Sequence, residues 1–479
     1  MIVVSKSINY WWYMNKLNVW KKPFGFIYSL GEKHLGTSTI SFRGVLGIFL
    51  PILIDLSLVT FINVINVAMI SSSGTEAVAA VSMVDSLNML LVNLFIAIAT
   101  GGTVVVAQYK GKGDRENMSI SASQSITSSV VIALALTVSM IIFSRPILSF
   151  IFQSANAQVL DYGYIYLLGS CISYPFFAIN QSVIGSYRGM GESRTAMMFS
   201  VFINGLFLIF NFLFIKLLGM GVLGISISIV VCRILGAVFA IFYMAFFSTT
   251  IRVKAKWIFS FRWKIQKSIL LIGMPSASEQ VFFNGGKLLT QTFIAGLGTV
   301  AMATNAIASS IITMYYIPVN AVTLTVITVV GQCIGAGKVD SAKRFIKNAV
   351  IASSILAAVV CLLFAPFSGL LLSLYNPIDE VKNMSYPLLF LCMFAIPLLW
   401  SMGFVTPSGL RGAGDAGFTS ITALTTMWTI RIGLGWVLTF TFGLGLLGIF
   451  IAMVVEWGVR GTVFLIRLRG KKWYKHKIV

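Results

Sequence analysis

Four carboxylic acids stand inside long apolar stretches of this sequence, where little water is available to solvate a charge. They are Asp55, Asp85, Glu279 and Glu456. Burying one such charge in lipid costs roughly 2.5 to 3.5 kcal/mol, so each acid calls for a role. Such a carboxylate can exchange a proton, hold Na⁺ or meet a cationic ligand. The alternative is an ion pair with cations of the same stretches, Arg233, Lys287 and Arg431. For Glu456 a pair is favoured, because Arg460 follows four residues later.

Asp55 and Glu279 occupy matching positions, since each lies four residues after a proline early in its apolar stretch. We predict that the two acids face each other across the molecule and are the first candidates for ion coupling. Asp85 is a further candidate, one helical turn before Asn88 on the same face. Any of the three acids could also bind a cationic ligand.

The second half of the sequence repeats the first, which accounts for the matching acids. Pro51 corresponds to Pro275 at a shift of 224 residues. The same shift relates Gly74 to Gly298, Gln108 to Gln332, Gly111 to Gly335, and Gly219 to Gly443. The motif Arg-Gly-x-Gly followed by an acid recurs at a shift of 223, from Arg188 to Arg411. Internal repeats of this kind are typical of membrane transport proteins.

Composition places both halves in a membrane. The 479 residues are 57% hydrophobic and 10% charged, against about 25% charged residues in soluble domains. Stretches near or above the roughly 20 residues that span a bilayer recur from about Val45 to about Leu468. We therefore predict an all-α integral membrane protein, with about twelve transmembrane helices in two homologous six-helix lobes around a central cavity. Six spans in each half give both lobes the same orientation.

The basic residues lie mostly in alternate loops, which predicts the topology. By the positive-inside rule these loops and both termini are cytoplasmic, in a multi-pass protein of the cell inner membrane. The formal charge of +21 therefore indicates orientation and not a nucleic-acid partner. The predicted regions are an interfacial N-terminal segment (1–44), the N-lobe (45–249), a basic cytoplasmic linker (250–267), the C-lobe (268–468) and a basic cytoplasmic tail (469–479).

The order of these motifs resembles that of the multidrug and toxic compound extrusion (MATE) proteins. The motifs are Pro with a following acid, Gly-Thr-x-Ala, Gln-x-x-Gly-x-Gly and Arg-Gly-x-Gly-acid, and they extend from about Pro51 to about Arg467. The resemblance implies a secondary antiporter that exports cationic or amphiphilic small molecules in exchange for H⁺ or Na⁺ by alternating access. It implies no cofactor or metal besides the coupling ion.

The sequence departs from the family at the acids that couple transport to an ion. One branch of the family has a proton-coupling Asp late in the first span, where this sequence has Asn66. An amide cannot titrate, although Asn66 shares a helical face with Asp55 and stays a candidate. Another branch has acids where this sequence has Phe283-Asn284 and Trp400. The choice between H⁺ and Na⁺ is open at this point.

Two further sets of residues are assigned by position. Gln108 and Gln332 fall near cytoplasmic helix ends. We expect Arg188 and Arg411, each in a short cytoplasmic turn, to bind the C-terminal carbonyls of a helix as structural groups. Candidates for the wall of the cavity are Asn63, Lys287, Arg233, Arg431, Tyr315, Tyr316 and Trp400. The aromatic members would suit flat amphiphiles, although packing within the lobes would explain them equally.

Other classes of protein fit less well. A flippase for a lipid-linked or anionic substrate of the same wider superfamily is the alternative, with Arg233, Lys287 and Arg431 meeting the headgroup. An enzyme is disfavoured because the only histidines, His34 and His476, lie in terminal segments. A channel is disfavoured because the repeat has no filter-like loop. We expect a monomer whose partners are membrane lipid and a small-molecule substrate.

Overall fold

The protein is built from long helices joined by short turns. The computed structural model describes residues 25–70, 74–151, 156–248, 250–251, 253–476 and 478–479, and no strand occurs among them. Residues 1–24, which hold most of the predicted interfacial segment, lie outside the described residues. The short helices outside the two lobes are α2 (Gly25–Leu35) and α9 (Ala255–Phe259).

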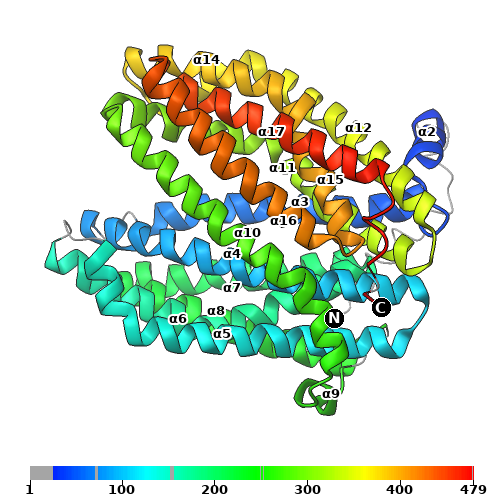
Figure 1. Ribbon diagram of the computed structural model, residues 1–479. Helices are drawn as coiled ribbons and strands as arrows, with labels where there is room; N and C mark the ends of the chain where they lie inside the picture. The colour runs from blue at the N-terminus through cyan, green and yellow to red at the C-terminus, as the bar shows by residue number, and fades with distance from the viewer. Residues whose placement is uncertain (1–24, 71–73, 152–155, 249, 252, 477) are drawn as a thin grey trace.

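Two bundles of six helical segments make up the rest, as predicted (Figure 1). The N-lobe comprises α3 (Phe42–Ile70), α4 (Thr75–Lys112), α5 (Arg115–Ile151), α6 (Ala157–Met190), α7 (Ser193–Asn211) with η2 (Phe212–Leu217), and α8 (Gly221–Phe242) with η3 (Tyr243–Phe247). The C-lobe comprises α10 (Trp263–Gly296), α11 (Thr299–Gly335), α12 (Val339–Phe364) with η4 (Ala365–Phe367) and α13 (Ser368–Ser373), α14 (Asp379–Ala395) with η5 (Ile396–Trp400) and α15 (Ser401–Gly412), α16 (Ala416–Thr426) with η6 (Met427–Leu434) and η7 (Val437–Thr441), and α17 (Gly445–Arg469).

The helices follow from the apolar stretches, because a helix satisfies its own backbone hydrogen bonds in lipid. Within the described residues, eleven helices are long and apolar enough to cross a membrane. The remaining long helix, α10, spans 34 residues and carries several charged side chains, among them Glu279 and Lys287. It packs against α4 of the N-lobe and against α16 of its own lobe, and Glu279 is buried there while Lys287 is exposed.

The turns of the two lobes repeat each other in backbone conformation. Ten glycines of the described chain have positive φ, a region that side chains disfavour. They form five pairs at the sequence shift: Gly74 (101°) and Gly298 (97°), Gly113 (80°) and Gly337 (73°), Gly191 (86°) and Gly414 (99°), Gly219 (64°) and Gly443 (67°), and Gly221 (53°) and Gly445 (54°). The predicted internal repeat is therefore confirmed at the level of individual turns.

The lobes meet at the ends of their helices that carry the basic loops, on the right of Figure 1. The Gln108 side chain donates to the Gly412 carbonyl of the C-lobe at 3.0 Å, and Gln332 donates to the Gly189 carbonyl of the N-lobe at 3.0 Å. An added Cβ on Gly111 would lie 2.0 Å from the Gln332 carbonyl oxygen. We call this contact the inter-lobe joint. At their other ends the two bundles diverge in the same view.

The predicted linker and tail both pack against this end of the molecule. Gln124 of α5 donates to the carbonyls of Trp257 and Ser260 in the linker, at 2.7 and 2.6 Å. In the tail, Trp473 is fully buried and Ile478 is 8% exposed. Ser268 of α10 donates to the Ile478 carbonyl at 2.7 Å. The last residues of the chain are therefore part of the packed structure.

Candidate functional site

A cavity of about 780 Å³ opens in the C-lobe where that lobe faces α4 of the N-lobe. This volume lies in the range of sites for drug-sized ligands. The helices α10, α11, α15 and α17, with parts of η5, α16 and η6, supply most of its wall, and Met89 and Asn93 of α4 supply the N-lobe side. Of the predicted wall residues, Lys287, Arg431, Tyr316 and Trp400 line this cavity.

One wall of the cavity is aromatic. The Trp400 ring stacks on Phe404 with 4.1 Å between ring centres and on Tyr316 with 5.3 Å. Trp400 and Phe404 are four residues apart, so the transition from η5 to α15 keeps both rings on one side. Tyr315 points elsewhere: it is fully buried and packs on Phe364. Its prediction as a wall residue is wrong, because adjacent residues on a helix lie about 100° apart.

Another part of the wall is cationic. Lys287 Nζ and Arg431 Cζ lie 5.2 and 5.4 Å from the centre of the Phe283 ring. Arg431 donates to Glu456 at 2.8 Å, and Arg460 contacts the other oxygen of Glu456 at 3.2 Å. The predicted pair between Glu456 and Arg460 is confirmed, and Arg431 joins it. Among the described residues, no carboxylate lies within 4.0 Å of Lys287.

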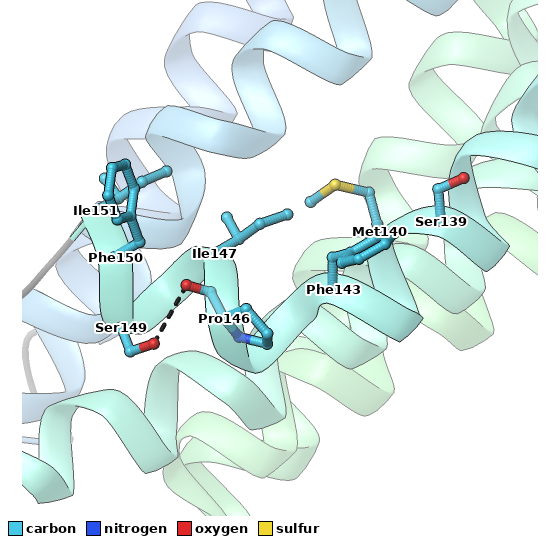
Figure 2. A pocket seen from close by; sticks show the side chains of 8 residues that line it. All are labelled: Ser139, Met140, Phe143, Pro146, Ile147, Ser149, Phe150 and Ile151. Atoms are coloured by element: carbon cyan, nitrogen blue, oxygen red, sulfur yellow. Dashed lines mark hydrogen bonds between the residues drawn. The ribbon is translucent and has the colours of Figure 1, made fainter.

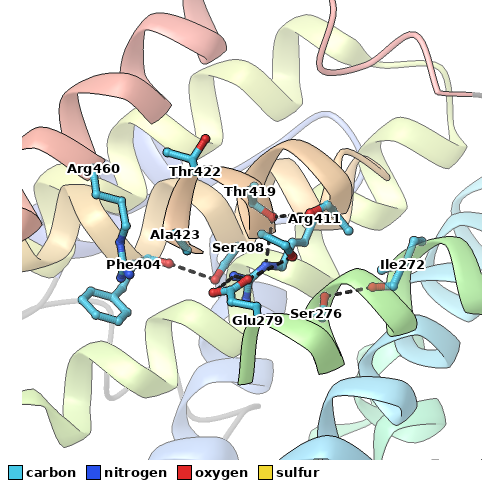
Figure 3. Close-up of polar contacts among 12 residues, drawn as sticks. Ile272, Ser276, Glu279, Phe404, Ser408, Arg411, Thr419, Thr422, Ala423 and Arg460 are labelled. Atoms are coloured by element: carbon cyan, nitrogen blue, oxygen red, sulfur yellow. Dashed lines mark hydrogen bonds and ion pairs between the residues drawn. The ribbon is translucent and has the colours of Figure 1, made fainter. Parts of the chain in front are cut away.

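The two matched acids each pair with an arginine of their own lobe. Arg188 contacts Asp55 at 2.6 Å, and Arg411 contacts Glu279 at 2.7 Å. Figure 3 shows Arg411 beside Glu279 at the end of α15. The alternative pairing of these two acids with Arg233, Lys287 or Arg431 is wrong, because their partners are Arg188 and Arg411.

The role expected for these two arginines also needs correction. Their side chains do not bind the helix C-terminal carbonyls. They pair with the acids inside the lobes instead, because a hydrogen bond to a carboxylate is stronger than one to a carbonyl. The turn glycines Gly191 and Gly414 satisfy the helix ends in their place, through their backbone N–H groups. Arg188 and Arg411 therefore bind the first and seventh spans to the rest of their lobes.

Asp85 lies in a different environment within the N-lobe. Tyr166 donates to its carboxylate at 2.9 Å and Asn88 at 3.3 Å, while Tyr174 in turn donates to Asn88 at 2.6 Å. No cation lies within 4.0 Å of Asp85 in the described chain. Asp85 does not line the cavity, although Met89, one helical turn further along α4, does.

The remaining N-lobe candidates lie outside the cavity wall. Arg233 donates to Ser173 at 2.7 Å and lies over the Phe177 ring at 4.5 Å, close enough to Asp85 to act on it electrostatically. Asn66 is buried and accepts a hydrogen bond from Asn211 at 3.0 Å, so an amide pair stands at this position of the first span. Asn63 is exposed. Neither Asn63 nor Arg233 lines the cavity, contrary to expectation.

Sequence reasoning missed many of the wall residues, among them Phe283, Phe404 and Arg460. The signal for the two aromatics was their spacing of four residues from Lys287 and Trp400. Arg460 was recognised only as a partner of Glu456, although the face that it shares with Trp457 and Met453 lines the cavity. The described residues contain no group of three or more His, Cys, Asp or Glu side chains that could hold a metal ion.

A second pocket, of about 670 Å³, lies along α5 between Ser139 and Ile151 (Figure 2). A single helix lines it, mostly with apolar side chains such as Met140, Phe143 and Phe150. Phe143 and Phe150 are 55% and 77% exposed. Among the described residues that line this pocket, the only polar side chains are two serines. Such a shallow apolar depression on a spanning helix suits lipid chains.

Comparison with known proteins agrees with this architecture. The MatE family model matches residues 51–213 and 275–437, so both halves match at the shift of 224 residues. An uncharacterised transporter of Bacillus subtilis, YisQ, is 26% identical over 88% of this chain and 93% of its own length. A probable multidrug resistance protein, NorM of Thermotoga maritima, is 24% identical over 84% of this chain and 87% of its own length.

A solved structure shows the same fold. It is a transporter of the MOP superfamily from Pyrococcus furiosus, described by the reverse polarity of its binding pocket. It superposes with a TM-score of 0.79 at 22% identity, over 92% of this chain and 97% of its own. The family model alone covers about two thirds of the sequence, in two copies that coincide with the two lobes. This chain therefore belongs to the MatE family, the multidrug and toxic compound extrusion transporters.

Proposed function

We propose that the protein is a secondary antiporter that exports amphiphilic small molecules in exchange for H⁺ or Na⁺. The observation that carries this proposal is the cavity of about 780 Å³ facing the other lobe, in a molecule whose lobes contact each other at one end. Two lobes that rock about such a cavity provide alternating access. The multidrug resistance proteins among the relatives support export of small molecules.

The orientation follows from the charges of the loops. In this proposal the basic loops and both described chain ends face the cytoplasm. The inter-lobe joint then closes the cytoplasmic side, and the cavity opens outward. Each chain contains a complete cavity, so a monomer is a sufficient transport unit.

Asp85 is the acid that we propose for ion coupling. A coupling acid must gain and lose its ion without leaving a neighbouring arginine unpaired. Asp55, Glu279 and Glu456 each fail this condition, because an arginine contacts each of them. Asp85 is held by Tyr166 and Asn88, which are neutral groups that can also bind its protonated or Na⁺-bound form.

The proposal is tested in proteoliposomes with an imposed pH or Na⁺ gradient and two fluorescent amphiphiles, one anionic and one cationic. We expect movement of at least one dye against its gradient with one of the two ions, and loss of this accumulation in Asp85→Asn. The matched control is Asp379→Asn, at the exposed start of α14, which should behave as the wild type. Absence of ion-driven movement of either dye would reject antiport. Unchanged accumulation in Asp85→Asn would reject the assignment of the acid.

A further inference from the structure

We infer that the C-lobe cavity binds aromatic amphiphiles that carry an anionic group, a carboxylate or a phosphate. The inference names a substrate class for the proposed exporter and rests on that function only for the direction of transport. Cationic compounds are what the family resemblance implies, and the charges of this cavity favour the opposite sign.

The charges of the wall do not balance. Four cationic side chains line the cavity, namely Lys287, Arg411, Arg431 and Arg460. The wall also contains two carboxylates. Glu279 forms an ion pair with Arg411, and Glu456 forms ion pairs with both Arg431 and Arg460. One arginine charge and the Lys287 charge are therefore left without a counter-ion from the wall. In the N-lobe, Asp85 has Arg233 of its own lobe within electrostatic range.

Unsatisfied donors accompany this excess charge. Arg431 is 7% exposed, and its Nε has no hydrogen-bond partner. Trp457, which lines the cavity, is 3% exposed, and its indole Nε1 also has no partner. Buried donors are nearly always paired, so two orphans in one wall indicate a missing acceptor. A carboxylate or phosphate supplies acceptors only, and it suits both an arginine and an indole N–H.

The aromatic wall identifies the rest of the ligand. Tyr316, Trp400 and Phe404 form a continuous stack, and Arg460 covers the far side of that stack at 4.1 Å from the Phe404 ring centre. Figure 3 shows Arg460 next to Phe404. A flat ring system that stacks on this surface lies in the same cavity as Lys287 and Arg431, whose charges suit its acidic group. The N-lobe side adds only the neutral Met89 and Asn93.

The test uses the full-length protein in detergent and two xanthene dyes that differ in charge. Fluorescein is anionic and rhodamine 6G is cationic, and binding of each is followed by fluorescence anisotropy. We expect tighter binding of fluorescein. Lys287→Gln should weaken fluorescein binding about tenfold, the scale of one charge-assisted hydrogen bond, without weakening rhodamine 6G. Lys287→Arg should retain fluorescein binding, which separates loss of charge from loss of fold.

Lys216→Gln is the matched control, because Lys216 is exposed and lies far from the wall at the end of η2. Tighter binding of rhodamine 6G to the wild type would overturn the inference. So would fluorescein binding that is unchanged in Lys287→Gln while the Lys216→Gln control also behaves as the wild type. These measurements need no ion gradient, so a failure of antiport and a failure of anion preference are distinguishable.

Competition then separates a soluble anion from a lipid headgroup. Naphthoate and phosphatidylglycerol are each added to the complex of protein and fluorescein. Displacement by naphthoate at the lower concentration supports a soluble aromatic acid as the substrate. Displacement by phosphatidylglycerol at the lower concentration supports an anionic lipid. Failure of both to displace the dye would show that fluorescein binds outside the proposed site, and it would overturn the inference.

Discussion

The two lobes are nearly identical where they meet and different where they line the cavity. At the joint, Gln108 and Gln332 make reciprocal contacts, and each lobe has its own acid and arginine pair. In the cavity, Lys287 corresponds to Asn63 of the N-lobe at the repeat shift. Two more pairs that differ in charge are Glu456 with Cys232 and Arg460 with Gly236. The two halves therefore share the groups of the joint and differ in the groups that line the cavity.

The largest expected effect concerns the two matched ion pairs. Arg188→Ala and Arg411→Ala each leave a buried carboxylate without its cation, which should lower the free energy of unfolding by about 3 to 5 kcal/mol. Unfolding in detergent, followed by circular dichroism, measures this loss. Asp55 has one carboxylate oxygen that is already unpaired, while Glu279 also accepts from Ser420. Arg188→Ala should therefore be at least as destabilising as Arg411→Ala.

Two controls test whether the loss of stability comes from the unpaired carboxylate. Arg115→Ala removes an exposed arginine at the same end of the molecule and should change stability little. The double change Asp55→Leu with Arg188→Leu removes both charges, and it should be far less destabilising than Arg188→Ala alone. A large loss for one lobe with none for the other would show that the two pairs are not equivalent.

A smaller effect is expected at the joint itself. An added Cβ would lie 2.0 Å from a facing carbonyl oxygen at Gly111 and 1.9 Å at Gly335. Gly111→Ala and Gly335→Ala should each destabilise the closed joint by about 1 to 3 kcal/mol and so separate the lobes at this end. Spin labels on Lys112→Cys and Asp340→Cys report the separation, since the five native cysteines are buried.

Gly285→Ala is the control for the joint, because an added Cβ there meets nothing within 4 Å. We expect a longer distance between the labels in both joint variants and no change in the control. Equal distances between the labels in all three proteins would mean that the joint accommodates a methyl group without opening. The prediction that Gly111 and Gly335 hold the lobes in close contact would then fail.

The smallest expected effect is a pH dependence confined to the N-lobe. Hydrogen bonds from Asn117 lower the pKa of Asp114 below its ordinary value of 3.8. Because the pKa of Asp114 is lower in the folded state than in the unfolded state, its ionised carboxylate stabilises the fold. This stabilisation is complete above pH 4 and is lost as the pH falls through the lowered pKa. Asp114 is mostly exposed, so the free energy of unfolding falls by about 0.5 kcal/mol at most. Lys338, which is not an acid, stands at the matching C-lobe position.

Melting temperatures between pH 5 and pH 3 test this difference. The wild type should lose slightly more stability over this range than Asp114→Asn, whose amide oxygen can accept the bond from the Asn117 backbone N–H at every pH, while its NH2 group cannot accept the second bond from the Asn117 side chain. Lys338→Gln should follow the wild type. Parallel curves for the wild type and Asp114→Asn would remove Asp114 as a source of pH dependence.

Much of the architecture could be predicted from the sequence, because it depends on local or periodic information. Apolar stretches define the spans, and a constant shift of 224 residues relates Pro51 to Pro275 and one lobe to the other. The pair between Glu456 and Arg460 follows from helical spacing alone. The joint glutamines could be located at helix ends for the same reason.

The partners of the matched acids could not be predicted in this way. Asp55 and Arg188 are 133 residues apart, and their contact depends on how α3 packs on the end of α6. The choice between Tyr315 and Tyr316 depends on the rotation of α11, which a uniformly apolar helix does not reveal. The charge of the cavity depends on which cations share one carboxylate, and spacing gives no information about that.

The packed tail has a consequence for biosynthesis. Asp415 contacts both Arg467, at 2.8 Å, and His476, at 3.0 Å, so the end of the chain closes over the turn after α15. Arg467 lies in the last span, α17, and His476 follows it, so both are added after the other spans. The nascent chain must therefore insert all of its spans before this end of the molecule can be completed. A protein truncated between α17 and His476 would have a normal set of spans and would lack part of the contacts that complete this end of the molecule.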